Sequence, residues 1–311
     1  MSIDDFGIDE AHLILKTAQK FEKLLETKRR INVLHGYNLA TLFFEPSTRT
    51  KLSFESAMLR LGGSILPVVG QTTSLEKGES FPDMGRVISS YADIAVMRHP
   101  KEFSVHELCK GSNIPVINAG DGANEHPSQS LVDLYTVQKS QGRLENLTIG
   151  FLGDLKYGRA AHSTVKLLSR YPINFVFISH DKLKLPESVL KVVKDNKSEY
   201  EETDQLHDVI NKIDVLYVTR VQKERFLDLD EYEEVKTVFQ VNRGTLIDAK
   251  KSLSVMHPLP RLEEIQREVD LDPRATYFDQ VQNGLYVRMA LLTILLGKVR
   301  NVDGLKALEK L

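Results

Sequence analysis

Three hydroxyl side chains and one arginine lie together in the segment Pro46-Ser47-Thr48-Arg49-Thr50. Pro46 ends an apolar run, and the hydroxyl residues open a segment whose apolar residues have helical spacing. The unpaired amides of a helix N-terminus favour a phosphate, and a guanidinium can add two parallel hydrogen bonds to it. The segment therefore predicts a phosphate site, with simple helix capping by Ser47 as the alternative. Since no P-loop pattern occurs, ATP is not the indicated ligand.

His126-Pro127-Ser128-Gln129 repeats this design. Pro127 suits the first position of a helix, so His126 and Gln129 are expected at the entrance of that helix. A histidine there could act as a general base or donate a hydrogen bond to an oxyanion. The helix N-terminus and nearby arginines disfavour its protonated form, so we favour the donor role over the base. A structural histidine is the alternative.

Arginines also follow other apolar runs. Arg98 ends the run IAVMR, and Arg159 and Arg220 follow two runs in the second half of the chain. We interpret Arg159 and Arg220 as clamps for two carboxylates, with Gln222 beside the second. The alternatives are surface salt bridges for these two arginines and a solvated side chain for Arg98.

A nicotinamide dehydrogenase is one hypothesis for the class of protein, because Val241–Asp248 resembles a segment of hydroxy-acid dehydrogenases. Glycines 150, 153 and 158 do not form the G-x-G-x-x-G fingerprint, however. Lys156 and Tyr157 occupy the turn in which a pyrophosphate needs bare backbone. The sequence does not favour this hypothesis.

The elements that must position these residues alternate along the chain. Short β-branched or aromatic runs predict strands, and the longer segments between them have helical patterns. Such alternation predicts an α/β fold of two doubly wound parallel-sheet domains, with ligands at the carboxyl ends of the strands. The expected strands are Leu39–Glu45, Ser64–Val69, Ile94–Arg98, Pro115–Ala119, Thr148–Leu152, Asn174–Ser179, Val215–Thr219, Val238–Asn242 and Leu253–Met256. The expected helices are 47–61, 82–91, 103–110, 127–140, 158–170, 187–195 and 278–298.

The length of 311 residues suits two domains. The polar stretch Ser140–Asn146 is the expected junction between a domain at 1–142 and another at 143–284. We expect the active site in the cleft between the domains and a C-terminal helix, 285–311, that packs back on the first domain.

Composition excludes several classes of protein. The net charge of -2 provides no long-range attraction for nucleic acid or an anionic membrane. No apolar run approaches the roughly 20 residues of a membrane span, and the acidic N-terminus is unlike a signal peptide. A single cysteine, Cys109, excludes an internal disulfide and a cysteine-based metal site. We expect a soluble, cytoplasmic protein.

Several of these segments together resemble one known family. Phe44–Thr50, Arg98 and His126–Gln129 are similar to the signature of the aspartate/ornithine carbamoyltransferases, and the similarity extends through GDLKYGR, TRVQKER and HPLPR. It therefore covers nearly the whole chain. The later motifs resemble the aspartate-specific members, because the ornithine enzymes are expected to carry a His-Cys-Leu-Pro turn and a Ser-Met-Gly. Here the turn reads His257-Pro258-Leu259-Pro260, and Ser-Met-Gly is absent.

The resemblance implies transfer of the carbamoyl group of carbamoyl phosphate to L-aspartate, giving N-carbamoyl-L-aspartate and phosphate early in de novo pyrimidine biosynthesis. It implies that Arg49, Thr50, Arg98 and His126 are catalytic. The phosphate would be held by Ser47, Thr48, Arg49 and Thr50, and the carbonyl oxygen by Thr50, Arg98 and His126. Gln129 and the carbonyls of Leu259 and Pro260 would hold the carbamoyl amine, and Arg159, Arg220 and Gln222 the aspartate carboxylates.

The resemblance also implies a homotrimer in which Ser74 and Lys77 reach into the site of a neighbouring subunit. A solvated loop lysine is the alternative for Lys77. No cofactor, metal, nucleic-acid partner or membrane partner is implied, and regulatory chains are left open. Two further alternatives are an ornithine-type carbamoyltransferase and a non-catalytic member of the fold.

Overall fold

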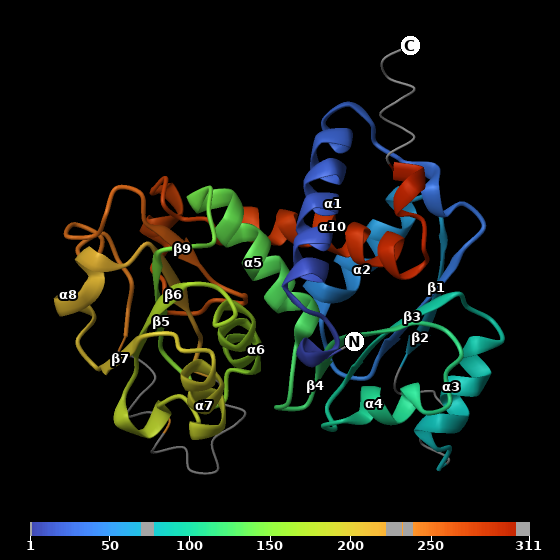
Figure 1. The fold of residues 1–311 in the computed structure, drawn as a ribbon, viewed down its shortest axis with the longest axis horizontal. Helices are drawn as coiled ribbons and strands as arrows, with labels where there is room; N and C mark the ends of the chain where they lie inside the picture. The colour runs from blue at the N-terminus through green and yellow to red at the C-terminus, as the bar shows by residue number, and fades with distance from the viewer. Residues whose placement is uncertain (1, 70–77, 222–231, 233–238, 303–311) are drawn as a thin grey trace. The chain divides into compact units, whose positions relative to one another are not determined.

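The computed structural model describes residues 2–69, 78–221, 232 and 239–302. The described residues form two compact units, which are drawn in Figure 1. The first unit lies within Met1–Leu131 and Gln282–Leu311, and the second within Val132–Val281. Helices α5 (Pro127–Gln141) and α10 (Tyr277–Leu295) each contribute residues to both units. The domain bounds expected from the sequence, and the return of a C-terminal helix, stay predictions.

The first unit contains a parallel sheet with the strand order β2-β1-β3-β4. Its strands are β1 (Asn38–Phe43), β2 (Ser64–Val69), β3 (Ile94–His99) and β4 (Val116–Asp121). The chain adds β2 on one side of β1 and β3 on the other, so the sheet is doubly wound. Its topological switch point lies between the carboxyl ends of β1 and β3, where open α/β sheets bind ligands.

The helices of the first unit bury apolar side chains. They are α1 (Ile8–Thr27), α2 (Thr48–Arg60), α3 (Phe81–Ser89) and α4 (Ser104–Cys109), and the unit also contains parts of α5 and α10. One core cluster joins the strands to α3 and α4. Its buried residues are Ala40, Leu42, Met84, Ala92, Ala95, Met97, Val105, Leu108 and Val116.

The second unit contains a parallel sheet with the order β7-β6-β5-β8-β9. Its strands are β5 (Leu147–Leu152), β6 (Ile173–Ile178), β7 (Tyr200–Thr203), β8 (Val215–Val218) and β9 (Ser254–Met256). The chain runs outward from β5 through β6 to β7, then returns to the other side of β5 as β8. This sheet is therefore also doubly wound, with its switch point between β5 and β8.

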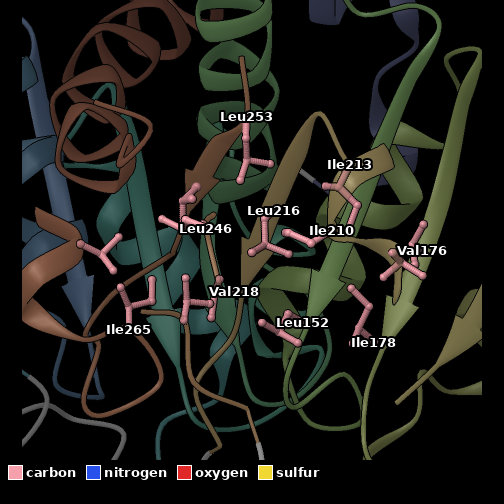
Figure 2. Close-up of a cluster of buried hydrophobic side chains, with 14 of the residues drawn as sticks. Leu152, Val176, Ile178, Ile210, Ile213, Leu216, Val218, Leu246, Leu253 and Ile265 are labelled. Atoms are coloured by element: carbon pink, nitrogen blue, oxygen red, sulfur yellow. The ribbon is translucent and has the colours of Figure 1, made fainter. Parts of the chain in front are cut away.

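Apolar side chains from four of these strands, β5, β6, β8 and β9, contribute to the core of the second unit (Figure 2). The same buried cluster contains Ile210 and Ile213, which precede β8, together with Leu152 of β5, Val176 and Ile178 of β6, Leu216 of β8 and Val255 of β9. Helices α6 (Arg159–Leu168), α7 (Glu187–Asp195) and α8 (Leu206–Val209) lie in this unit with parts of α5 and α10, and α6 packs on α7 (Figure 1). Burial of this cluster provides the hydrophobic stabilisation that holds the strand ends in place.

Eight of the nine expected strands are confirmed, but Val238–Asn242 is wrong as a strand. Val238 lies outside the described residues, and Val241 forms only an isolated bridge with Ile265. Asn242 then turns the chain, because its side-chain oxygen accepts from the backbone N–H of Thr245 at 2.9 Å. Helix α1 and strand β7 were not expected. Within the described ranges, no helix is both long and apolar enough to cross a membrane.

Candidate active site

The expected phosphate-binding segment lies at the carboxyl end of β1 and forms the start of α2. Ser47 occupies the N-cap position, yet its side chain makes no capping hydrogen bond, so capping is not what its hydroxyl does here. Thr50 is buried, whereas Thr48 and Arg49 are exposed. The first turn of α2 thus combines the positive end of the helix dipole with hydroxyl and guanidinium donors, as an anion site requires.

Arg98 lies beside this segment because β3 is the neighbour of β1. Phe43 pairs with Arg98 in the sheet register, and the N–H of Phe44 donates to the carbonyl of Arg98 at 2.9 Å. The Arg98 Nε lies 2.6 Å from Oε1 of Glu45, an ion-pair separation between two half-buried side chains. Glu45 therefore orients the guanidinium at the switch point, a role that the sequence analysis did not assign.

His126 follows β4, which lies next to β3 in the sheet, and the carbonyl of His126 accepts hydrogen bonds from the first turn of α5. The N–H groups of Gln129 and Ser130 donate to that carbonyl at 2.9 and 3.2 Å. The buried His126 ring has its Nδ1 3.4 Å from Oγ of Ser128. A Ser128 hydroxyl that donates to Nδ1 places the ring proton on Nε2, the tautomer in which Nε2 is the donor.

Asp121 holds the loop that carries His126. Its buried carboxylate accepts from Nδ2 of Asn118 at 2.9 Å, from Nδ2 of Asn124 at 3.0 Å and from the N–H of Phe103 at 2.9 Å. The next carboxylate, Glu125, accepts from the Ser2 hydroxyl at 2.7 Å and from the N–H of Ile3 at 3.1 Å. The start of the chain is thereby tied to the residue before His126.

The two expected carboxylate clamps lie on either side of the switch point of the second sheet. Arg159 is the first residue of α6, after β5, and Arg220 follows the end of β8; both are half-buried. Oδ1 of Asp154 accepts from the N–H groups of Lys156 and Tyr157, at 3.1 and 2.9 Å, which shapes the loop before Arg159. Thr219 Oγ1 donates to the carbonyls of Leu152 and Asp154, so the ends of β5 and β8 are bound together.

Leu259 and Pro260 follow β9, the next strand in that sheet, and are joined by a cis peptide bond. The buried side chain of His257 lies under this turn and contacts Leu259 and Glu264. Burial lowers the pKa of His257, and the charges of Arg220 and Arg261 lower it further, against an opposing hydrogen bond to Glu264. The imidazole is therefore neutral near pH 7.

Ser74, Lys77 and Gln222 lie outside the described residues. The structure places the others at two sheet edges: the Ser47–Thr50 segment, Arg98, His126 and Gln129 in the first unit, and Arg159, Arg220, Leu259 and Pro260 in the second. Cys109 is remote from the edge motifs in sequence and ends α4. Among the described residues, no group of three or more histidine, cysteine or acidic side chains is arranged to hold a metal ion.

Sequence reasoning also missed Arg288, which lies behind the phosphate segment. This buried arginine of α10 donates from Nη1 to the hydroxyl of Ser53, and its guanidinium lies 5.1 Å from the ring centre of Phe54. Ser53 in turn donates to the carbonyls of Arg49 and Thr50, at 2.7 and 2.8 Å. An arginine at an apolar helix position was the available signal, since arginine is seldom buried unless paired.

Fold and site together define a two-unit α/β protein with the expected anion-binding residues at the switch point of each sheet. Residues 1–139 match the profile of the aspartate/ornithine carbamoyltransferase carbamoyl-P binding domain, and residues 145–295 match that of the Asp/Orn binding domain. The chain belongs to the aspartate/ornithine carbamoyltransferase family.

Individual relatives are similar over nearly their full length. The aspartate carbamoyltransferase catalytic subunit of Thermococcus onnurineus is 47% identical, with 96% of each chain covered. That of Clostridium acetobutylicum is 50% identical, covering 94% of this chain and 96% of the relative. The catalytic subunit of M. jannaschii aspartate transcarbamoylase superposes with a TM-score of 0.89 at 47% identity, covering 96% of this chain and 97% of that one. Aspartate transcarbamoylase from Trypanosoma cruzi, solved with carbamoyl phosphate and aspartate, has a TM-score of 0.89 at 37% identity, covering 94% of both chains.

Proposed function

We propose that this chain transfers the carbamoyl group of carbamoyl phosphate to the α-amine of L-aspartate, an early step of pyrimidine biosynthesis. The observation that carries the proposal is the position of arginine and hydroxyl residues at both switch points, where they suit anionic ligands. The helix N-terminus with Arg49 suits a phosphate, and Arg159 with Arg220 suits a dicarboxylate. The relatives named aspartate carbamoyltransferase catalytic subunit, at 47% and 50% identity, support the same reaction.

In this reaction the aspartate nitrogen attacks the carbamoyl carbon. A C–N bond forms, the C–O bond to phosphate breaks, and the departing phosphate accepts the amine proton, so no side chain is needed as a base. Arg49, with Ser47, Thr48 and Thr50, binds the phosphate, while Thr50, Arg98 and His126 donate to the oxyanion. Each oxyanion donor is worth about 100-fold in rate. Gln129 and the carbonyls of Leu259 and Pro260 hold the carbamoyl amine.

Aspartate is favoured over ornithine because of the charges at the second switch point. Arg159 and Arg220, with Gln222, present two guanidinium groups to the amino-acid substrate, which matches two carboxylates. The side-chain ammonium of ornithine would face a like charge instead, and like charges placed together cost several kcal/mol.

The test is to mix the purified chain with carbamoyl phosphate and either L-aspartate or L-ornithine, and to measure phosphate release and carbamoylated product. We expect product with aspartate alone. Product with ornithine would show that the arginines were misinterpreted, and no product with either would contradict the proposed reaction.

We further propose that the enzyme is a cytoplasmic homotrimer in which Ser74 and Lys77 complete the site of a neighbouring subunit. The support is the family resemblance. Mixed trimers test it, because Lys77→Ala and Arg49→Ala chains can together form one intact site. Random assembly of equal amounts should restore about a quarter of the wild-type activity. Mixed trimers that are no more active than either variant alone would contradict a shared site.

A further inference from the structure

A buried carboxylate–imidazole pair lies under the turn that follows β9. His257, the first residue after β9, has 1% of its surface exposed, and Glu264 has 7%. His257 Nε2 lies 2.8 Å from Oε1 of Glu264, and His257 Nδ1 accepts from the N–H of Leu259 at 2.7 Å. Because Nδ1 accepts this hydrogen bond, the ring proton must be on Nε2, where it is donated to Glu264.

Glu264 also holds the far side of the same turn. Its Oε2 accepts from the N–H of Leu262 at 3.0 Å, so the two oxygens of one carboxylate bind His257 and Leu262. Glu264 is itself anchored through its backbone, because its carbonyl accepts from the N–H of Val241 at 2.9 Å. The N–H of His257 donates to Oε1 of Gln280 on α10 at 3.0 Å, which fixes the imidazole at its base.

The turn needs such support because Leu259 has a left-handed backbone. Its φ is +55°, a region in which a non-glycine residue costs on the order of 1–3 kcal/mol unless its surroundings hold it. The hydrogen bond from Leu259 to His257 is the contact that holds the N–H of this residue.

The charges around the pair favour a neutral imidazole beside an ionised carboxylate. Burial lowers the pKa of His257, and the charges of Arg220 and Arg261 act in the same direction, against the opposing hydrogen bond and charge of Glu264. Burial is the largest single influence on the pKa of Glu264 and acts to raise it. The hydrogen bonds from His257 and from backbone N–H groups, together with the electrostatic interaction with His257, outweigh burial, so the pKa of Glu264 lies below its ordinary value. A protonated imidazole would carry a hydrogen on Nδ1, which would face the N–H of Leu259 and break the hydrogen bond between them.

We propose that Glu264 is a positioning residue, which acts through His257 to aim the carbonyls of Leu259 and Pro260 at the carbamoyl amine. The inference rests on the proposed function, because these carbonyls are the amine-binding groups of that proposal. Glu264 fixes the tautomer of His257, the tautomer fixes the N–H of Leu259, and the N–H fixes the plane of the turn.

The test compares the dissociation constants of carbamoyl phosphate and inorganic phosphate in Glu264→Gln. A glutamine can accept from His257 or from Leu262 but opposes the other with its amide hydrogens. We expect the dissociation constant of carbamoyl phosphate to rise about tenfold, the value of one well-made hydrogen bond, and kcat to fall. The dissociation constant of phosphate should stay within about twofold, because phosphate does not contact the turn.

Glu263→Gln is the matched control, because it makes the same chemical change at the adjacent, exposed glutamate. It should leave both dissociation constants unchanged. If Glu264→Gln shifts both ligands equally, or shifts neither, the positioning role is contradicted. A wild-type enzyme that forms no carbamoyl-aspartate would instead contradict the proposed function, whatever the variants do.

A second pair of variants decides the question if Glu264→Gln fails to fold. His257→Asn keeps an oxygen near the position of Nδ1 for the N–H of Leu259, whereas His257→Phe keeps a ring without an acceptor. We expect His257→Asn to retain at least about tenfold more carbamoyl phosphate affinity than His257→Phe, at equal phosphate affinity. Equal carbamoyl phosphate affinities in the two variants would overturn the proposal.

Discussion

Replacing Gly153 with alanine tests whether the end of β5 sets the position of Arg220. Gly153 has a φ of +110°, and a Cβ added to it would lie 2.5 Å from the carbonyl oxygen of Thr219 and 2.9 Å from its Oγ1. The Thr219 N–H donates to the carbonyl of Leu152 at 2.8 Å, so Thr219 cannot yield without the end of β8 moving. Arg220 is the next residue and must move with it.

The expected size of the effect follows from two costs. A non-glycine residue at this φ costs about 1–3 kcal/mol, and forcing a methyl group into a packed contact costs about 1–3 kcal/mol more. We therefore expect Gly153→Ala to lower the free energy of unfolding by about 2–6 kcal/mol. A shift of Arg220 by about 1 Å should lower kcat/KM for aspartate about 100-fold, with the dissociation constant of phosphate unchanged.

Gly142→Ala is the control, because Gly142 lies in the same unit with a φ of +71° but its Cβ would meet no heavy atom within 4 Å. It should cost only about 1–2 kcal/mol and leave aspartate kinetics unchanged. Urea unfolding and steady-state kinetics measure both quantities. The reasoning is refuted if the two variants have equal effects, or if folded Gly153→Ala keeps the wild-type kcat/KM for aspartate.

Three further predictions concern single groups. Arg49→Ala should abolish turnover, whereas Arg220→Ala should chiefly raise KM for aspartate; near-normal turnover of Arg49→Ala in a product assay would remove the phosphate assignment. Asp133→Ala should lower the free energy of unfolding in urea by about 3–5 kcal/mol, because this fully buried carboxylate accepts from Thr164, Tyr217 and Gln280. Asp133→Asn keeps one acceptor oxygen and should lower it by less than half as much. Burial lowers the pKa of His99, His162 and His257 from 6.5, so the unfolded chain binds protons first as pH falls. The free energy of unfolding should therefore be full above about pH 6.5 and decline below it, and His162→Gln should lessen the decline. Equal losses of unfolding free energy between about pH 8 and pH 5 in the wild type and in His162→Gln would contradict this prediction.

The residues at the carboxyl edge of each sheet could be predicted, because all strands of a parallel sheet end at the same edge and the residues that follow them therefore lie there. Arg98 ends an apolar run, and Ser47–Thr50 and His126 follow two others within a short loop; the structure puts those runs side by side as β1, β3 and β4. The same reasoning placed Arg159 and Arg220 after two strands of the second half, which the structure pairs as β5 and β8. It needed only strand positions and the doubly wound rule.

Other elements left signals that were weak or were not used. Helix α1 buries Ala11, Ile14, Leu15, Ala18 and Phe21, a helical spacing that was present in the sequence but not interpreted. Strand β7 reads YEET and pairs only at the edge of its sheet, so it has no apolar pattern to reveal it. Val238–Asn242 has the composition of a strand, but Asn242 turns the chain at once.

The supporting hydrogen-bond networks could not be predicted, because their partners are far apart in the sequence. Glu125 binds Ser2, more than a hundred positions earlier, and Arg288 binds Ser53. Their polar types alone do not specify a partner. Only the fold brings these groups into contact, so such positioning residues emerge after the chain is folded.

A competition experiment with carbamoyl phosphate labelled at its carbamoyl carbon tests directly whether the chain transfers the carbamoyl group to L-aspartate. The chain is mixed with this substrate and equal amounts of L-aspartate and L-ornithine, and the labelled products are identified by NMR. We expect the label to appear in N-carbamoyl-L-aspartate, with one phosphate released for each carbamoyl group transferred. Label in the carbamoylated ornithine, or no transfer to either amine, would contradict it.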